Sequence, residues 1–191
     1  MPLHELAKCY EFPAPIKQAI NDLLYNSIYI ITLQFKKDNI GNHFALNFPD
    51  PSIIFHRLSK LNFLGPEYCL ENGGTTLLVE VTFRPNSDLA NQENKKVVDR
   101  VIDDLEKLKL IEKDQLIDST IRAFEYAYVI YELNHRKNTD LVLNYLKDQN
   151  IFCCGRFAQF EYMNTDKVIE EAMVLSDYMN KKRLNEIGNY K

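Results

Sequence analysis

Glycine is scarce in this sequence. The 191 residues contain six glycines, about 3% of the chain against a typical ~7%. They occupy positions 41, 65, 73, 74, 155 and 188, and no two of them bracket a single residue. Neither a G-x-G-x-x-G turn nor a G-x-x-x-x-G-K-[ST] loop can therefore be written. Both loops need glycine so that backbone N–H groups can approach a phosphate. A phosphate-binding loop of the usual kind is excluded from these residues.

Charge, cysteine and histidine patterns exclude further classes. The formal net charge of −4 gives no basic field for nucleic acid or anionic lipid. Cys9, Cys69, Cys153 and Cys154 form no C-x-x-C pair, and the four histidines form no H-x-x-x-H, so no metal site is expected. No apolar run approaches the ~18 residues that cross a bilayer, and the first residues have no apolar leader core. We expect a soluble, cytoplasmic protein with reduced cysteines, without nucleic-acid partners or a membrane span.

The first half of the chain reads as one helix followed by strands. Residues 15–26 place Ile16, Ile20, Leu23 and Leu24 on one helical face. Apolar, β-branched or alternating segments at 27–37, 43–51, 53–63 and 75–83 predict strands separated by turn residues. This spacing predicts an antiparallel sheet within residues 15–86.

Helices dominate the second half. The stretch 88–110 repeats apolar residues at helical spacing, and Ser87 or Asp88 is the expected cap; these residues are Val97, Val98, Val101, Ile102, Leu105 and Leu108. A strand over 116–131, a helix over 138–150 capped by Asn138 or Thr139, and a short buried strand at 151–154 follow. A last helix begins near Asp166. The predicted class is α+β: one domain over 1–191, with a mostly antiparallel sheet of five or six strands flanked by helices.

Two side-chain patterns have a structural and a functional interpretation. Asp99, Asp103, Asp104 and Glu106 are expected to form a solvated face of the 88–110 helix. The aromatic residues at 124, 126 and 128 fall on one strand face at period two. That spacing favours a sheet core over the lining of a pocket.

The segment 151–175 is the most informative for function. An apolar stretch ends at Cys154, Gly155 permits a turn, Arg156 offers a fork of donors, and a helix begins soon after. Helix N-termini and guanidinium groups both favour anions and polarised carbonyl oxygens. The structural alternative is a connecting loop whose arginine bonds backbone carbonyls or a carboxylate.

The segment IFCCGRFAQFEYMNTDKVIEEAM also resembles the C-terminal motif of the FAD-dependent UDP-galactopyranose mutases and their protoporphyrinogen-oxidase-like and amine-oxidase-like relatives. In that family a strand, a Gly-Arg pair, a tyrosine and a helix start close over the flavin. AYVIYELNHRKNTDLVLNYLKDQNIF and FHRLSKLNF are similar to further family segments, as is MPLHEL. Together these similarities extend over residues 2–175.

The resemblance implies roles for particular residues. Gly155, Arg156, Asn164 and Thr165 match positions that approach FAD. The implied substrate-binding residues are Arg57, Tyr128 and Tyr162, which match positions that hold the nucleotide-sugar pyrophosphate in the mutases. Three positions depart from the mutase pattern, namely Asn164 in place of Asp, Phe160 in place of Tyr and Val129 in place of Pro. These departures favour the oxidoreductase-like branch.

The resemblance also implies a missing half. The family's dinucleotide-binding domain has no counterpart here, so the ADP half of FAD is expected to lack a partner on this chain. The implied function is the substrate-binding, flavin-closing part of a flavin-dependent oxidoreductase or mutase acting on a small molecule such as a nucleotide-sugar or an amine. We also expect an apolar seam, and with it a homo-oligomer or a separate dinucleotide-binding partner. The alternative function is a non-catalytic binding or interaction module that keeps the fold without flavin.

Overall fold

The computed structural model describes residues 1–70 and 73–188, and the side chains of the last helix as far as Lys182. The chain forms two compact units, residues 1–25 with 128–191 and residues 26–127. The first unit contains the helices α1 (Leu3–Cys9), α2 (Ala14–Asn21), α4 (His135–Asp148) and α5 (Thr165–Gly188). The second contains α3 (Asn94–Lys107) and most of a five-stranded sheet.

The sheet confirms the predicted α+β class and its antiparallel character. Its strands are β1 (Leu24–Phe35), β2 (Ala45–Asn47), β3 (Arg57–Lys60), β4 (Thr75–Phe83) and β5 (Leu116–Ile130), in the order β2-β3-β4-β1-β5. In the centre, Ile31 lies opposite Val79, and Arg57 lies opposite Glu80 on the other side of β4. One edge of the sheet is the three-residue β2, and the other is the fifteen-residue β5.

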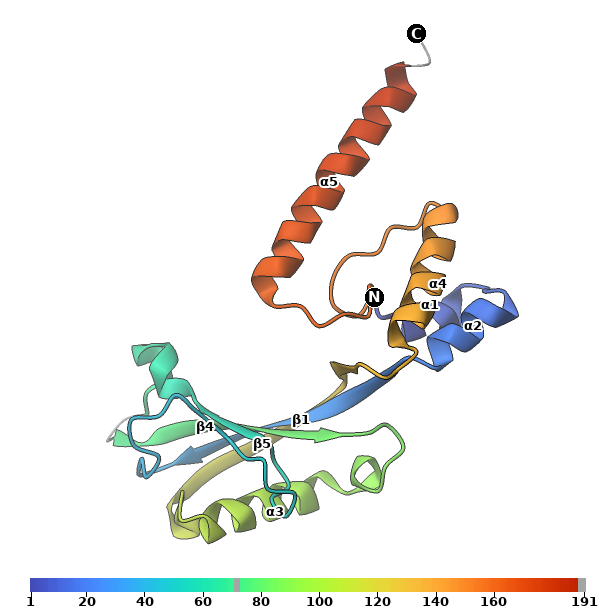
Figure 1. Cartoon of the computed structure of the whole chain (residues 1–191). Coiled ribbons are helices and arrows are strands. Elements are labelled where there is room, and N and C mark those ends of the chain that lie inside the picture. Colours follow the sequence, from blue (N-terminus) through green and yellow to red (C-terminus); the bar gives the residue numbers. More distant parts are fainter. Residues whose placement is uncertain (71–72, 189–191) are drawn as a thin grey trace. The chain divides into compact units, whose positions relative to one another are not determined.

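The core of the second unit lies between the sheet and α3, which runs along one sheet face (Figure 1). Alternate residues of β1 and β4, such as Ile31, Leu33 and Val79, are fully buried there. They meet five of the six apolar residues expected to form the helical face; these are Val97, Val98, Val101, Ile102 and Leu105. Leu108 follows the helix and is more than a third exposed. The period-two and period-3.6 patterns therefore identify the facing surfaces correctly.

The first unit has a separate core. Residues from α1, α2, α4 and the segment before α5 enclose it, among them Leu3, Ile20, Val142, Leu146 and Phe160. Ile16 and Ile20 of α2 are buried as the helical pattern predicts. The predicted helix over 15–26 is too long, because α2 ends at Asn21 and Leu24 begins β1. Figure 1 shows α4 beside α2.

Three helix starts differ from the expectations. The sequence pattern contained no indication of α1. A 3-10 turn at Leu89–Asn91 comes before α3, whose N-cap residue is Glu93. Ser87 is therefore too early in the chain to cap α3. Its hydroxyl accepts the Ala90 N–H at 3.4 Å instead. α4 begins three residues before the expected Asn138, and the Thr139 hydroxyl donates back to the His135 carbonyl at 2.8 Å, a bond that side chains form inside a helix.

Two strands are shorter than predicted, and one predicted strand is absent. Only Ala45–Asn47 of 43–51 and only Arg57–Lys60 of 53–63 are strands. Residues 151–154 are half-buried and belong to no strand. The apolar character of Ile151 and Cys153 reflects packing against the first core rather than pairing. The aromatic face of β5 is not a sheet core, since Phe124 is 49% exposed.

Asp104 is not part of a solvated face. Its side chain is 8% exposed and accepts the Ile54 N–H at 2.9 Å and the Arg100 Nε–H at 3.4 Å. The Arg100 guanidinium also donates to the Ser52 carbonyl at 3.2 Å. These bonds attach the loop before β3 to α3. In contrast, Asp103 and Glu106 are exposed as expected and bind Lys113.

We predict that Asp104→Ala lowers the free energy of unfolding by about 1–3 kcal/mol, because the Ile54 N–H loses its acceptor. Asp99→Ala, which removes an exposed carboxylate of the same helix, is the matched control and should change stability by less than about 0.5 kcal/mol. Urea denaturation followed by circular dichroism measures both. Equal effects of the two substitutions would contradict the structural role of Asp104.

Candidate functional site

The candidate site of the first unit begins at the turn made by Gly155. This residue has φ of +93°, in the region that favours glycine. A Cβ built there would meet only Val168 Cγ1, at 3.8 Å. The glycine is therefore required by the backbone conformation rather than by lack of space, and it brings the loop next to the first turns of α5.

Arg156 is fixed in orientation by its own loop. Its Nε and Nη2 donate to the Met163 carbonyl at 3.2 and 2.7 Å, and its guanidinium lies 4.6 Å from the centre of the Tyr162 ring. Two bonds to one oxygen and a stacked ring define the plane of the group. The structural alternative from the sequence, an arginine that bonds backbone carbonyls, describes these two bonds.

The loop is held further by hydrogen bonds to α4 and to the residues before it. The His135 ring and the Phe160 carbonyl are 2.8 Å apart at Nε2 and O. Phe160 is fully buried and has φ of +52°, which is uncommon for a residue with a Cβ. The Tyr162 N–H donates to the Tyr131 hydroxyl at 2.7 Å. These contacts place Tyr162 with its ring about half exposed.

The N-terminus of α5 completes the group. The helix begins at Thr165, and the Val168 N–H donates to the Asn164 carbonyl at 3.1 Å. The amides of the first turn have no carbonyl partner within the helix and carry partial positive charge. Gly155, Arg156, Asn164 and Thr165 thus belong to one loop and one helix start. Tyr128 lies in the same unit near the end of β5 and is half-buried.

A cavity that the sequence did not indicate lies beside this loop. It has a volume of about 430 Å³ and is lined by Cys153, Cys154, Gln159, Lys167, Glu170, Glu171, Val174, Leu175 and Tyr178. Two buried acceptors, Gln159 Oε1 and Glu171 Oε2, have no hydrogen-bond partner there. The cavity lies between this loop and α5, and it depends on how the two pack, which no local sequence pattern gives.

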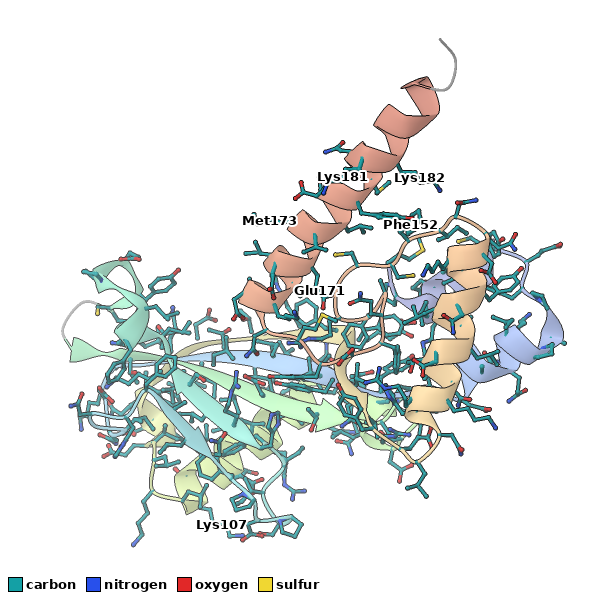
Figure 2. The ribbon with its side chains drawn as sticks, turned by 45° about the horizontal axis from the view of Figure 1, so that its top comes forward. Lys107, Phe152, Glu171, Met173, Lys181 and Lys182 are labelled. Atoms are coloured by element: carbon teal, nitrogen blue, oxygen red, sulfur yellow. The ribbon has the colours of Figure 1, made fainter. Side chains whose placement is uncertain are left out.

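Contacts beyond the cavity position the middle of α5. The Tyr178 and Phe152 rings meet edge to face at 5.5 Å, and Lys182 Nζ is 5.5 Å from the centre of the same Phe152 ring. Figure 2 shows Phe152 close to Lys182, which also donates to Asn150 Oδ1 at 2.7 Å. Other apolar residues of α5 are half or more exposed; these are Ile169, Met173, Val174 and Met179. Ile169 and Met173 are one turn apart, whereas Val174 and Met179 lie on other sides of the helix, and Val174 also lines the cavity.

The remaining predicted residue, Arg57, belongs to the second unit. It forms an ion pair with Glu80, whose carboxylate is 4% exposed, while the Arg57 side chain is 43% exposed. His56 Nε2 lies 3.5 Å from the same carboxylate, and the His56 N–H donates to the Glu80 carbonyl oxygen at 3.1 Å. Sequence reasoning missed Glu80, although a carboxylate inside the apolar run TTLLVEVTF was a usable signal.

The comparisons with known proteins support the fold and leave the family open. No protein-family model matches the sequence, and no curated protein matches it. A reduced UDP-galactopyranose mutase superposes with a TM-score of 0.66 and 17% identity, over 74% of this chain and 30% of that one. A putative protoporphyrinogen oxidase from Exiguobacterium sp. 255-15 gives 0.61 and 17%, over 82% and 35%. This chain has the fold of one part of these proteins. It spans about a third of their length.

The resemblance noted in the sequence is thereby confirmed at the level of fold. The individual site residues remain predictions. Within the part of the chain that the structure describes, no helix is long and apolar enough to span a membrane.

Burial raises the pKa of the Cys153 thiol, so its reactive thiolate is less populated at neutral pH. We predict that iodoacetamide modifies Cys153 more slowly than the exposed Cys9 and Cys69. Its rate should continue to rise above the pH at which an ordinary thiol, with a pKa of about 8.5, levels off. Peptide mass spectrometry of samples quenched between pH 7 and 10 measures this. Fast labelling of Cys153 at pH 7 would show that the loop and α5 do not shield it.

Proposed function

We propose that this chain is the substrate-binding and flavin-closing part of a flavin-dependent oxidoreductase or mutase. A dinucleotide-binding unit outside these 191 residues would complete the enzyme. The observation that carries the proposal is the group formed by Gly155, Arg156 and the start of α5, in a fold shared with UDP-galactopyranose mutase. The matching order of these parts along the sequence supports the assignment.

The donor set fits one end of FAD. The pyrimidine edge of the flavin ring carries electron-rich carbonyl oxygens, and N–H groups complement them. The N-terminal amides of α5 and the guanidinium of Arg156 are such donors, and the half-exposed ring of Tyr162 offers an apolar face beside them. The ADP half finds no comparable partner, because the sequence has no glycine-rich phosphate loop. When bound, the flavin supplies the redox chemistry.

The chain's own residues would bind and orient the substrate. Glu80 holds one end of the Arg57 guanidinium, and the group is still 43% exposed. An arginine fixed in this way is suited to a phosphate, because its planar fork matches phosphate oxygens and loses little freedom on binding. We therefore favour an anionic substrate such as a nucleotide-sugar for Arg57. Tyr128 and Tyr162 would contribute rigid apolar surfaces and hydroxyl donors.

One observation favours the alternative, a binding module without flavin. The Met163 carbonyl already occupies two of the N–H groups of Arg156. A loop that satisfies its arginine internally can serve as structure alone. Flavin binding by the purified chain distinguishes the two functions.

We predict weak binding that depends on the flavin ring and is similar for FAD, FMN and riboflavin, because only the ring has partners here. Flavin fluorescence quenching measures the affinities. Arg156→Ala should weaken binding roughly tenfold, the usual cost of losing a charged hydrogen-bonding group. Arg156→Lys should weaken it too, since the planar fork is lost. Lys17→Ala, at an exposed position of α2 in the same unit, is the control and should leave binding unchanged.

Two outcomes would contradict this proposal. FAD binding much tighter than riboflavin binding would place an ADP site on this chain. Absence of any quenching, in a sample shown by circular dichroism to be folded, would favour the module without flavin.

A further inference from the structure

We propose that the chain forms a two-fold symmetric dimer by pairing its β5 edge with the β5 edge of a second copy. The proposal concerns residues 116–124, which lie in the second unit. It does not depend on flavin binding, so either proposal can fail without the other.

The two edge strands of the sheet differ in length and in proline content. The β2 edge is three residues long and is followed by Pro49 and Pro51. Short strands and prolines are devices that prevent edge-to-edge pairing. The β5 edge is fifteen residues long and contains no proline, glycine or lysine. Among the described residues, no strand pairs with its outer side. An edge of this length without proline is suited to a strand partner that complements its exposed charges.

The exposure of β5 agrees with a missing partner. Residues 117–120 and 122–125 are all exposed. They include Ile117 at 53% and Phe124 at 49%, on opposite faces of the strand. A partner strand would cover part of both faces, since it places a neighbouring row of side chains beside each.

The charges of β5 select a second copy as that partner. Asp118 and Arg122 are both exposed, and they lie four residues apart around Thr120. When two copies pair antiparallel with the two-fold axis at Thr120, Asp118 of each copy faces Arg122 of the other. Opposite charges facing each other across strands stabilise the pair, and like charges destabilise it.

The other side chains are also compatible with this register. On the face of Thr120, Leu116 meets Phe124 of the second copy. On the other face, Ile117 meets Ala123 and Ser119 meets Ile121. No like-charged pair is formed within residues 116–124, and the exposed apolar residues lie opposite apolar residues. Each contact occurs twice, as an isologous interface requires.

Two-fold symmetry excludes the other possible charge pairing, in which Arg122 would face Glu125. Facing residues in an antiparallel pair alternate between hydrogen-bonded and non-hydrogen-bonded pairs. A two-fold axis must therefore pass between two copies of the same residue. Pairing Arg122 with Glu125 would place the axis between residues 123 and 124, which would make a hydrogen-bonded pair equivalent to a non-hydrogen-bonded one. The Thr120 register is the one that pairs Asp118 with Arg122.

Charge reversal tests the proposal. The wild-type protein should elute at the mass of a dimer in light scattering coupled to size exclusion. Dissociation should appear on dilution, because nine residues from each edge bury less than the roughly 1,600 Å² of a standard stable interface. Asp118→Arg and Arg122→Asp should each raise the dimer dissociation constant at least tenfold, since each creates two facing like-charged pairs. Asp99→Arg, the same change at an exposed position of α3, should leave it unchanged.

The two variants together give the sharpest result. Mixed in equal amounts, they should form a heterodimer. The D118R chain carries arginine at both positions and the R122D chain carries aspartate at both, so each facing pair again joins opposite charges. The double variant D118R/R122D should dimerise as the wild type does.

Three outcomes would overturn the proposal. The first is a wild-type protein that stays monomeric at all accessible concentrations. The second is a pair of single variants that remain dimeric with the wild-type dissociation constant. The third is a pair of single variants that fail to associate when mixed, although circular dichroism shows both to be folded.

Discussion

The packing of α3 against one face of the sheet is the interaction on which the second unit depends. Alternate residues of β1 and β4 meet the apolar face of α3, and both sets are almost completely buried. Because strand side chains alternate, this choice of inner face assigns every remaining side chain of β1 and β4 to the outer face. Glu80 is on the outer face for that reason, one residue from the buried Val79 and Val81. The same packing that makes the core thus places a carboxylate opposite Arg57.

The position of Glu80 has an energetic consequence. A buried carboxylate is costly unless charges or hydrogen bonds compensate it. Arg57 and His56 supply that compensation from the neighbouring chain segment. The arginine is therefore held for a structural reason and is still partly exposed. A residue that a fold must immobilise in any case is a good starting point for a binding site, because its ordering cost is met before a ligand arrives.

The spacing of apolar residues correctly predicted the strands and helices that bury one face against the core. The strand at 75–83 and the apolar face of α3 agree with the structure at the level of individual residues. The errors have a common cause. Asp104 is expected on a solvated face and is buried, because the Ile54 N–H, far along the chain, provides it with a partner. Likewise, the apolar segment 151–154 resembles a strand and is a packed loop.

The candidate site was predictable to the same extent. Gly155, Arg156 and the start of α5 are neighbours in sequence, and local rules bring them together. The cavity beside Gln159 depends on how α5 packs and could not be predicted, whereas the Arg156–Met163 bond lies within one loop and matches the structural alternative from the sequence.

The scarcity of glycine acquires a physical meaning from this arrangement. A phosphate-binding loop built from glycine uses backbone N–H groups as donors, and it needs a backbone that can approach the ligand closely. The loop before α5 turns at one glycine and then presents the Arg156 side chain. The Met163 carbonyl oxygen and the Tyr162 ring orient its guanidinium. A guanidinium reaches beyond the backbone, so close approach is not required of the other residues. Phe160 can accordingly occupy a positive-φ position that glycine would tolerate more easily, because its burial in the first core offsets the strain. One oriented guanidinium without a glycine-rich loop offers fewer donors to a pyrophosphate than a phosphate-binding loop does. On the proposed function, this loop would face the ring end of a bound flavin, and the phosphates would be held elsewhere.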